Sequence, residues 1–421
     1  MLRVDWHALP VTRESMEKRV VVVGGGAAGF FAAITCAQKA AAEPASTSVL
    51  LLEKGRDYLS KVRISGGGRC NVTNACFDVR ELVSSYPRGS RALIGPFHRF
   101  QPRDTITWFE ERGVPLKTES DGRVFPITDS SQTVIDCLVN EAERAGVHLR
   151  SNCGVTHLEK RSDGFELALA SGEKTSCDRV LLATGGCKAM PALATSLGHS
   201  LEPPVSSLFT FHIDEPWMRD LAGVSVGQVE AAVSIFKLRE TGPLLFTHWG
   251  VSGPVILRLS AWGARELSQT KYEFPLRVRW LPGHSHESLR SIFQIQREAT
   301  PGSLIVSTPI EKLPIRLWEK LALSAGIPRE MRWAILTREA QRNLIERLLN
   351  SVFHVSGKSP NKSEFVTCGG IPLKEVDFRT MESRICPGLY FAGELLDIDG
   401  ITGGFNFQAA WTTGWIAGRS M

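Results

Sequence analysis

The segment RVVVVGGGAAGFFAAI, residues 19–34, is the feature that most limits how this chain can fold. Its valines, residues 20–23, predict a strand that is buried on both faces. Residues 27–39 carry small and apolar side chains at helical spacing and contain no proline, so they predict a helix. The glycines between the two fit G-x-G-x-x-G, the spacing of a turn at which a helix N-terminus binds a diphosphate.

Each glycine of this turn has its own expected role. Gly24 permits the tight turn, Gly26 lets a diphosphate approach the backbone, and Gly29 lets the helix pack closely on the strand. A second predicted strand, residues 49–52, ends at Glu53, which follows Gly29 by 24 residues. Since this spacing is close to that of an acid that binds a ribose hydroxyl, the region predicts a dinucleotide site rather than an isolated solvated acid.

Composition and charge narrow the function classes. A chain of 421 residues is long enough for two or three domains. Its net charge of +5 is modest and the sequence has no long Lys/Arg run, so we expect no nucleic-acid partner. No apolar run approaches the length of a membrane span, and we expect no membrane partner. The nine cysteines form no C-x-x-C pair, which argues against a zinc site or a disulfide framework. We therefore expect a cytoplasmic protein without a bound metal.

The predicted elements divide the chain into consecutive parts of an α/β protein. Residues 1–17 are expected to form a disordered extension, and residues 18–189 the first part of the dinucleotide-binding domain. Residues 190–283 alternate strand-like runs with Gly and Pro, which predicts an inserted β domain. Apolar residues recur at helical spacing in residues 284–362, and residues 363–421 return to an α/β pattern.

Further glycine clusters follow predicted strands or precede helices. SGGGRCN, residues 65–71, has no strand directly before it, so its glycines are expected to admit a flat ring near the backbone. LLATGG, residues 181–186, ends a buried strand at the sheet edge where ligands bind in such folds. A last helix over residues 406–419 would direct its N-terminus at this edge and stabilise a negatively charged reduced flavin. The alternative is that these glycines form ordinary caps and turns.

The motifs VVVVGGGAAG, LLEKG, ISGGGRCNVTN, LLATGG, GPLLFTHWGVSGPVILRLS and GLYFAGELLDIDGITGGFNFQAAWTTG together resemble the BaiN-type bacterial flavoproteins. That family is also described as NAD(P)/FAD-dependent oxidoreductases or aminoacetone oxidase-family FAD-binding enzymes. The resemblance implies FAD and a glutathione-reductase-like FAD-binding Rossmann domain, split by a β-barrel-like and helical module. The residues expected to line FAD are Gly24, Gly26, Ala27, Ala28, Gly29, Glu53, Lys54, Gly68, Arg69, Cys70, Asn71, Val155, Thr184, Gly185, Gly393, Glu394, Gly403, Gly404, Phe405 and Asn406.

The expected function is that of an FAD-dependent oxidoreductase. Hydride or electrons would pass between flavin N5 and a small-molecule substrate held by the inserted module. Because no second strand-linked G-x-G-x-x-G occurs, NAD(P)H would dock only transiently as the electron donor. Two alternatives are a flavoprotein that acts on tRNA and a flavin-bound sensor without turnover. The sequence predicts no oligomeric state.

Several single residues have two interpretations. His248 is the candidate general acid or base, although local backbone hydrogen bonds would equally explain it. Arg69 would hold the diphosphate or a flavin carbonyl, or else form a surface salt bridge. Asp397 and Asp399 would lie near the substrate or be solvated loop acids, and the second interpretation is preferred here.

Two further pairs of residues could be mistaken for functional ones. Cys70 and Cys76 follow the glycine loop as a redox-active pair would, but five residues separate them, and Cys70 is expected to be a small packed residue. Trp411 and Trp415 are four residues apart on the last predicted helix, and we interpret them as packing residues.

Overall fold

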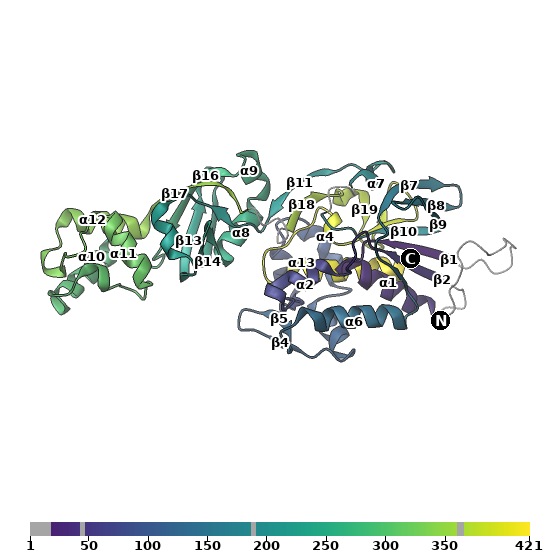
Figure 1. Ribbon diagram of the computed structural model, residues 1–421, viewed down its shortest axis with the longest axis horizontal. Helices are drawn as coiled ribbons and strands as arrows, with labels where there is room; N and C mark the ends of the chain where they lie inside the picture. Colours follow the sequence, from purple (N-terminus) through teal and green to yellow (C-terminus); the bar gives the residue numbers. More distant parts are fainter. Residues whose placement is uncertain (1–17, 43–46, 187–190, 360–365) are drawn as a thin grey trace.

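A computed structural model of the chain describes residues 18–42, 47–186, 191–359 and 366–421. The expected disordered extension, residues 1–17, and Cys187 lie outside the described residues. Among the described residues, no helix has the length and apolar character needed to span a membrane. Figure 1 shows two lobes, which we call the Rossmann lobe (residues 18–207 and 366–421) and the inserted lobe (residues 209–359).

The Rossmann lobe is built on a seven-stranded sheet of order β19-β20-β21-β10-β1-β2-β6. Strands β21, β10, β1, β2 and β6 are parallel, whereas β19 and β20 pair antiparallel at one edge. Their bounds are β1 Lys18–Val23, β2 Thr47–Leu52, β6 His148–Arg150, β10 Arg179–Leu182, β19 Val376–Asp377, β20 Glu382–Ser383 and β21 Leu389–Phe391. The valines of β1 are buried between β10 and β2, as expected of a central parallel strand.

Helices cover one face of this sheet. α1, Ala27–Ala40, packs against the last helix of the chain, α13, Phe405–Ser420, and against α6, Ser131–Arg144. The two long helices match the predicted spans 27–39 and 406–419 to within one residue at each end. Shorter helices complete the lobe: α2 Ser60–Ile64, α3 Val79–Ser84, α4 Ser90–Phe97, α5 Pro102–Glu110 and α7 Pro191–Thr195.

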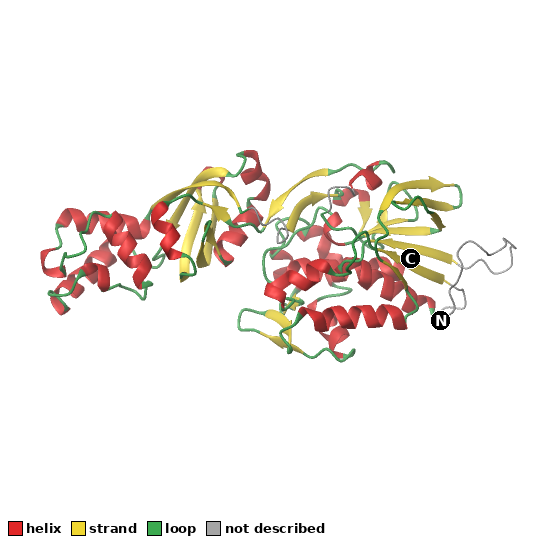
Figure 2. Cartoon of the chain, in the orientation of Figure 1, coloured by secondary structure: helices red, strands yellow, loops and turns green. Residues whose placement is uncertain are grey.

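Two small antiparallel sheets flank the main one (Figure 2). The first is the meander β7, β8 and β9, which lies beside β10 and β1. The second joins β3, β5 and β4 next to α13 and α5. Their bounds are β3 Thr73–Asn74, β4 Leu116–Thr118, β5 Arg123–Pro126, β7 Val155–Arg161, β8 Gly164–Leu169 and β9 Lys174–Cys177.

The inserted lobe has its own hydrophobic core, separate from that of the Rossmann lobe. Six strands close into a barrel in the order β12-β15-β14-β13-β16-β17. The barrel strands are β12 Phe211–His212, β13 Ser225–Val233, β14 Leu238–Thr247, β15 Gly250–Ser252, β16 Glu273–Arg279 and β17 Ser351–Lys358. β17 falls within residues 284–362, the range in which the sequence analysis expected helices, and its pairing with both β16 and β12 completes the barrel.

Helices and linking strands complete the inserted lobe. α8, Pro254–Trp262, packs on the barrel, and α9, Ala264–Gln269, lies near the Rossmann lobe. α10, His286–Ala299, α11, Ile315–Ser324, and α12, Arg338–Leu349, form the far end in Figure 1. The chain enters this lobe through β11, Glu202–Ser207, and returns through β18, Val366–Gly370, and these two strands pair antiparallel.

Candidate functional site

The turn after β1 is shaped by close backbone contacts. Gly24 has a φ of +114°, and a Cβ on this residue would lie 2.5 Å from the carbonyl oxygen of Ala183. A Cβ on Gly29 would lie 1.9 Å from the carbonyl oxygen of Gly24. Only glycine fits these two positions, because strand and helix pack too closely for any side chain.

Gly26 differs from these neighbours. Nothing lies within 4 Å of the position that its Cβ would take, and its φ of −93° is one that any residue can adopt. As N-cap of α1 it provides no side-chain cap, and the first turn of α1 contains no acid. The helix N-terminus therefore faces open space with unpaired N–H groups and a partial positive charge, an arrangement that fits a diphosphate.

Glu53 lies at the same edge of the sheet, one strand away. Its Oε2 accepts a hydrogen bond from Gly25 N at 2.8 Å, and its Oε1 accepts one from Gly55 N at 2.7 Å. Lys54 comes next to β7, because a Cβ on Gly154 would lie 3.5 Å from Lys54 Cβ. Val155, the half-buried first residue of β7, thus joins Glu53 and Lys54 at one end of the expected dinucleotide site.

The other end of the expected dinucleotide site lies where strands β10 and β21 end. Thr184 Oγ1 is buried and has no hydrogen-bond partner among the described residues. Gly185 follows with a φ of +61°, and its Cβ would meet Glu394 Oε2 at 3.5 Å. An unpaired buried hydroxyl beside a residue without a side chain suits contact with the edge of a bound cofactor. These residues fit FAD, as does the open N-terminus of α1.

Gly393 and the residues before α13 are held tightly. Gly393 has a φ of +71°, and its N–H bonds to Thr413 Oγ1 at 3.0 Å. Gly404, with a φ of +97°, would place a Cβ 2.4 Å from the Thr73 carbonyl. α13 begins at Phe405, one residue earlier than predicted, and its N-terminus carries no side-chain cap.

Two asparagines expected at the cofactor fasten these loops to one another. Asn406 exchanges two hydrogen bonds of 2.9 Å with the backbone of Gly400. With its amide oriented to satisfy both atoms, Asn71 accepts a hydrogen bond from Gly404 N at 2.9 Å and donates one to the Thr73 carbonyl. The SGGGRCN loop and the start of α13 are therefore joined, and Gly403 and Gly68 lie in these two loops with positive φ.

Lys61, a residue of α2, was not among the predicted site residues. Its ammonium pairs with Glu394 Oε2, and the other carboxylate oxygen of Glu394 accepts a hydrogen bond from Thr367 N at 2.7 Å. Lys61 and Glu394 are 333 positions apart in the chain. With a partner that distant in the chain and a helix of five residues, no local spacing in the sequence indicates Lys61.

Arg69 is engaged away from the sheet edge. Its Nη1 lies 2.8 Å from Glu119 Oε1 and 3.5 Å from Asp129 Oδ1, and its guanidinium lies 4.0 Å from the ring centroid of Phe125. These contacts match the interpretation of Arg69 as a salt-bridge residue. Its contact with FAD stays a prediction.

Neither cysteine near the glycine loop has the properties of a redox-active thiol. Cys70 is fully buried, and burial raises the pKa of its thiol to about 12. Burial, followed by the charge of Glu81, raises the pKa of Cys76 to about 11. Both residues are free cysteines. Since the thiolate is the reactive form, the interpretation of Cys70 as a packed residue agrees with this environment.

His248 lies in the exposed turn between β14 and β15 of the barrel. The next residue, Trp249, is 53% exposed, and its carbonyl accepts a hydrogen bond from Ile213 N at 2.9 Å. Among the described residues, His248 makes no hydrogen bond or ion pair, so the alternative of local backbone bonding lacks a partner here. Its role as an acid or base stays a prediction.

The preferred interpretation of Asp397 and Asp399 as solvated loop acids is wrong. Asp399 is completely buried, pairs with Arg88 and accepts a hydrogen bond of 2.7 Å from Ser207 Oγ. Asp397 accepts bonds of 2.8 and 2.7 Å from Arg265 Nη2 in α9. Asp397 thus connects the Rossmann lobe to the inserted lobe, whereas Asp399 joins Arg88 and the end of β11 within the Rossmann lobe. Trp411, in contrast, is a packing residue as predicted, fully buried against Phe31 and other rings.

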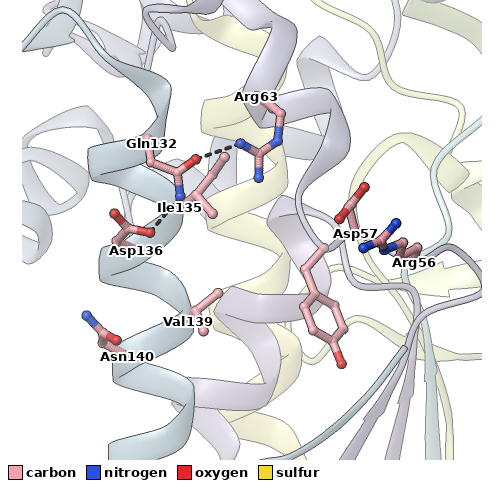
Figure 3. A pocket seen from close by; sticks show the side chains of 9 residues that line it. Arg56, Asp57, Arg63, Gln132, Ile135, Asp136, Val139 and Asn140 are labelled. Carbon is pink, nitrogen blue, oxygen red and sulfur yellow. Dashed lines mark hydrogen bonds between the residues drawn. The ribbon is translucent and has the colours of Figure 1, made fainter. Parts of the chain in front are cut away.

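A surface hollow of about 390 Å³ lies between α2 and α6 (Figure 3). Within it Arg63 Nη1 donates to Gln132 Oε1 at 2.6 Å, and Gln132 Nε2 donates to Asp136 Oδ1 at 2.6 Å. Tyr58, also in its lining, would meet a Cβ on Gly25 at 2.9 Å, so the hollow adjoins the dinucleotide turn. Its remaining lining residues are Arg56, Asp57, Ile135, Val139 and Asn140.

Comparison with known proteins gives matches over nearly the whole chain. The family model described as HI0933-like protein Rossmann domain matches residues 18–420. A ribosomal RNA dihydrouridine synthase of Escherichia coli (strain K12) is 32% identical over 395 residues, which are 91% of this chain and 94% of that protein. A 3-dehydro-bile acid delta(4,6)-reductase of Clostridium scindens is 29% identical, over 90% of this chain and 94% of its own. A second ribosomal RNA dihydrouridine synthase, from Haemophilus influenzae, is 27% identical over 89% of this chain and 92% of its own.

Proposed function

Because this chain belongs to the HI0933-like Rossmann-domain family of FAD-dependent oxidoreductases, we propose that it saturates a carbon–carbon double bond conjugated with a carbonyl group, with NAD(P)H as electron donor. The names of its relatives describe this one chemical step on different molecules. Dihydrouridine arises when two hydrogens add across the C5=C6 bond of uracil, which is conjugated with the C4 carbonyl. A delta(4,6)-reductase acting on a 3-dehydro compound adds hydrogen to double bonds conjugated with the C3 carbonyl.

The observation that carries the proposal is the row of side-chain-free positions along one sheet edge. It begins at Gly26, where the N-terminus of α1 is open, and continues to the unpaired hydroxyl of Thr184 and the positive-φ Gly185. Bound there, FAD would supply a centre that accepts hydride from a nicotinamide and passes it to carbon. The edge therefore supports an extended dinucleotide that reaches from β2 to β21.

The residues of this chain would bind and orient that cofactor. The N-terminus of α1 would hold the diphosphate and Glu53 a ribose hydroxyl. The uncapped N-terminus of α13 would stabilise negative charge at the flavin end. His248 is the candidate that supplies the proton which accompanies hydride addition to the double bond, and NAD(P)H would dock transiently because the sequence has no second nucleotide-binding turn.

We propose uracil within ribosomal RNA as the substrate, in place of the initial expectation that nucleic acid plays no part. Two relatives named above carry that activity, including one that is 32% identical. The charge pattern supports it: residues 211–358 contain 19 Lys and Arg but 14 Asp and Glu, so the barrel and its helices account for the whole net charge of +5. A basic module beside a redox centre suits a polyanionic substrate.

A small unsaturated ketone is the second candidate, favoured by the relative named as a bile-acid reductase. One pair of experiments separates the two. Anaerobic mixing of the FAD-loaded protein with NADH or NADPH should bleach the flavin absorbance, and mass spectrometry of unmodified transcribed ribosomal RNA should then show uridines that have gained two hydrogens. Saturation of 4-androstene-3,17-dione without any change in RNA would favour the small molecule. A protein that binds no FAD, or whose flavin neither nicotinamide reduces, would contradict the proposal.

A further inference from the structure

We propose that Lys61 is the cation that stabilises the negative charge of reduced FAD, and that Glu394 positions its ammonium group for this purpose. The inference rests on the proposed FAD site but on no particular substrate or electron donor. It assigns a role to a residue that the motif analysis passed over, and it follows from four features of the described residues.

The first feature is the position of the ammonium group. An ideal Cβ on Gly185 would lie 4.0 Å from Lys61 Nζ and 3.5 Å from Glu394 Oε2. Gly185 directly follows Thr184, whose hydroxyl oxygen is buried without a partner among the described residues. The ion pair thus borders the part of the sheet edge that is free of side chains and that we assign to the cofactor.

The second feature is the fixed orientation of the partner carboxylate. Glu394 Oε1 accepts a hydrogen bond from Thr367 N at 2.7 Å, and Oε2 pairs with Lys61. The side chain of Glu394 is 19% exposed, whereas that of Lys61 is 53% exposed. A carboxylate held by a backbone N–H on one oxygen offers the flexible lysine one defined place to bind.

The third feature is the number of donors that Lys61 retains. An ammonium group has three N–H donors, and Glu394 is its acceptor among the described residues. Two donors therefore remain for a ligand at the exposed side of the group.

The fourth feature is the contrast with the neighbouring cations. Arg63, two residues along α2, donates to Gln132 in α6 at 2.6 Å. Arg69, after the glycine loop, pairs with Glu119 and Asp129. Of the three basic side chains in residues 61–69, Lys61 is thus the one whose partner lies at the ends of β10 and β21.

The electrostatic consequence follows from the charge balance. Two-electron reduction of a bound oxidised isoalloxazine with uptake of one proton, the equivalent of one hydride, would leave one additional negative charge on the flavin, whichever donor supplies the electrons. A cation close to that ring stabilises the reduced form more than the oxidised form and therefore raises the reduction potential. Partial exposure of Lys61 weakens the effect through solvent screening but does not remove it.

The test is the two-electron reduction potential of bound FAD, measured against a reference dye with a chemical reductant, so that no nicotinamide or substrate is needed. For Lys61→Gln we expect the equilibrium constant for reduction to fall about tenfold, which is about 30 mV for a two-electron couple. Lys61→Arg should retain the wild-type potential. Arg63→Gln, which removes a charge from the same helix but from a side chain directed at α6, is the matched control and should also retain it.

The outcomes separate this inference from the proposed function. If Lys61→Gln binds FAD and keeps the wild-type potential, or if Arg63→Gln shifts the potential equally, the inference is overturned whatever the enzyme reduces. If Lys61→Gln fails to fold, Lys61→Met, which keeps the length and apolar stem of the side chain, provides the same measurement. Failure of the wild-type flavin to accept electrons from NADH or NADPH would contradict the proposed donor and leave the inference standing.

Discussion

Gly26 and Gly29 lie three residues apart in one turn, yet their substitution should have opposite consequences. Gly29 has no room for a side chain, because its Cβ would lie 1.9 Å from the Gly24 carbonyl oxygen. Gly26 has room in the protein itself but lies where the diphosphate is expected. The first constraint is one of folding and the second is one of ligand binding.

We therefore expect Gly29→Ala to lower the free energy of unfolding by about 2 kcal/mol, the usual cost of overpacking. Gly26→Ala should leave the unfolding of the FAD-free protein nearly unchanged but weaken FAD binding about tenfold, or about 1.4 kcal/mol. Urea titration of the apoprotein and fluorescence titration with FAD measure the two effects. Equal FAD affinity in Gly26→Ala and wild type would argue against a diphosphate at this helix end.

At this scale the sequence identified residues whose role depends on local spacing. Gly24 and Glu53 follow strands at fixed intervals, so their place at the sheet edge could be predicted. Lys61 could not, because its partner is 333 positions away and a helix that short gives no signal of direction. The burial of Asp399 was not predicted, because its contacts with Arg88 and Ser207 are distant in the sequence and an acid in a loop is usually solvated.

Among the secondary-structure elements, the packing of α1 against α13 joins the first and the last helix of the Rossmann lobe. A Cβ on Gly414 would lie 2.5 Å from the Ala28 carbonyl oxygen, and one on Gly418 would lie 2.5 Å from that of Ala32. These glycines allow the two helices to approach at backbone distance. Because Ala28 meets Gly414 and Ala32 meets Gly418, the two helices run in the same direction, and the close contact fixes the start of α1 against the middle of α13.

We expect Gly414→Ala to lower the free energy of unfolding by about 2 kcal/mol, since neither backbone can yield without moving a whole helix. Gly227→Ala in β13 is the control, because no atom lies within 4 Å of its Cβ position and its φ is not positive. Thermal unfolding followed by circular dichroism gives the comparison. A stability of Gly414→Ala equal to that of the control would contradict the close approach of α1 and α13.

Elements with a strong local pattern were predicted to within one residue at each end, as α1 and α13 illustrate. β17 was missed, although residues 351–356 alternate between buried and exposed. This alternation of six residues directly follows the longer helical pattern of α12 and is a weaker signal than that pattern. Its identity depends on its partners β16 and β12, which are distant in the sequence.

For the whole molecule, two ion pairs lie near the junction of the lobes, one within the Rossmann lobe and one between the lobes, and they differ in burial. Asp399 is completely buried and Arg88 is 12% exposed, so removal of the charge of Asp399 would leave a cation buried without a partner. Asp397 pairs with Arg265, which is 41% exposed and can turn to solvent. The two neighbouring acids should therefore differ in what they contribute to stability.

We expect Asp399→Asn to lower the free energy of unfolding by about 3 kcal/mol, as for other broken buried pairs. Asp397→Asn should cost less than about 1 kcal/mol, the value of a partly exposed pair. Each substitution removes one negative charge from the same loop, so each serves as the control for the other. Urea denaturation of both variants measures the difference, and similar losses would contradict the assigned burial.

The far end of the inserted lobe provides a separate test of the RNA proposal. His286 at the start of α10 lies 3.2 Å from Glu346 near the end of α12, and Arg297 near the end of α10 donates a hydrogen bond of 2.6 Å to the carbonyl of Leu336, just before α12, so the two helices are antiparallel. These helices carry the exposed residues Arg290, Arg338 and Arg342, which form no ion pair with any described residue. We refer to the two helices with these three arginines as the seam.

Replacement of all three arginines by glutamine should weaken binding of transcribed ribosomal RNA about tenfold and reduce the salt dependence by roughly two counterions. Filter binding between about 50 and 200 mM salt would detect both changes, because the affinity of proteins for nucleic acids depends strongly on salt in this range. The combined variant Arg80→Gln, Arg91→Gln and Lys374→Gln removes the same charge from exposed positions of the Rossmann lobe and should bind like wild type. Equal affinity in both triple variants would exclude this seam from RNA binding.

The pairing of β11 with β18 means that the chain leaves the Rossmann lobe and re-enters it at neighbouring strands, about 4.8 Å apart. The inserted residues, about 150 in number, thus leave and return through one two-stranded connection, which a few side-chain contacts such as Asp397–Arg265 supplement. The inserted lobe could therefore be exchanged for another module whose termini lie equally close. Such an exchange would change the substrate while the Rossmann lobe keeps the same redox chemistry.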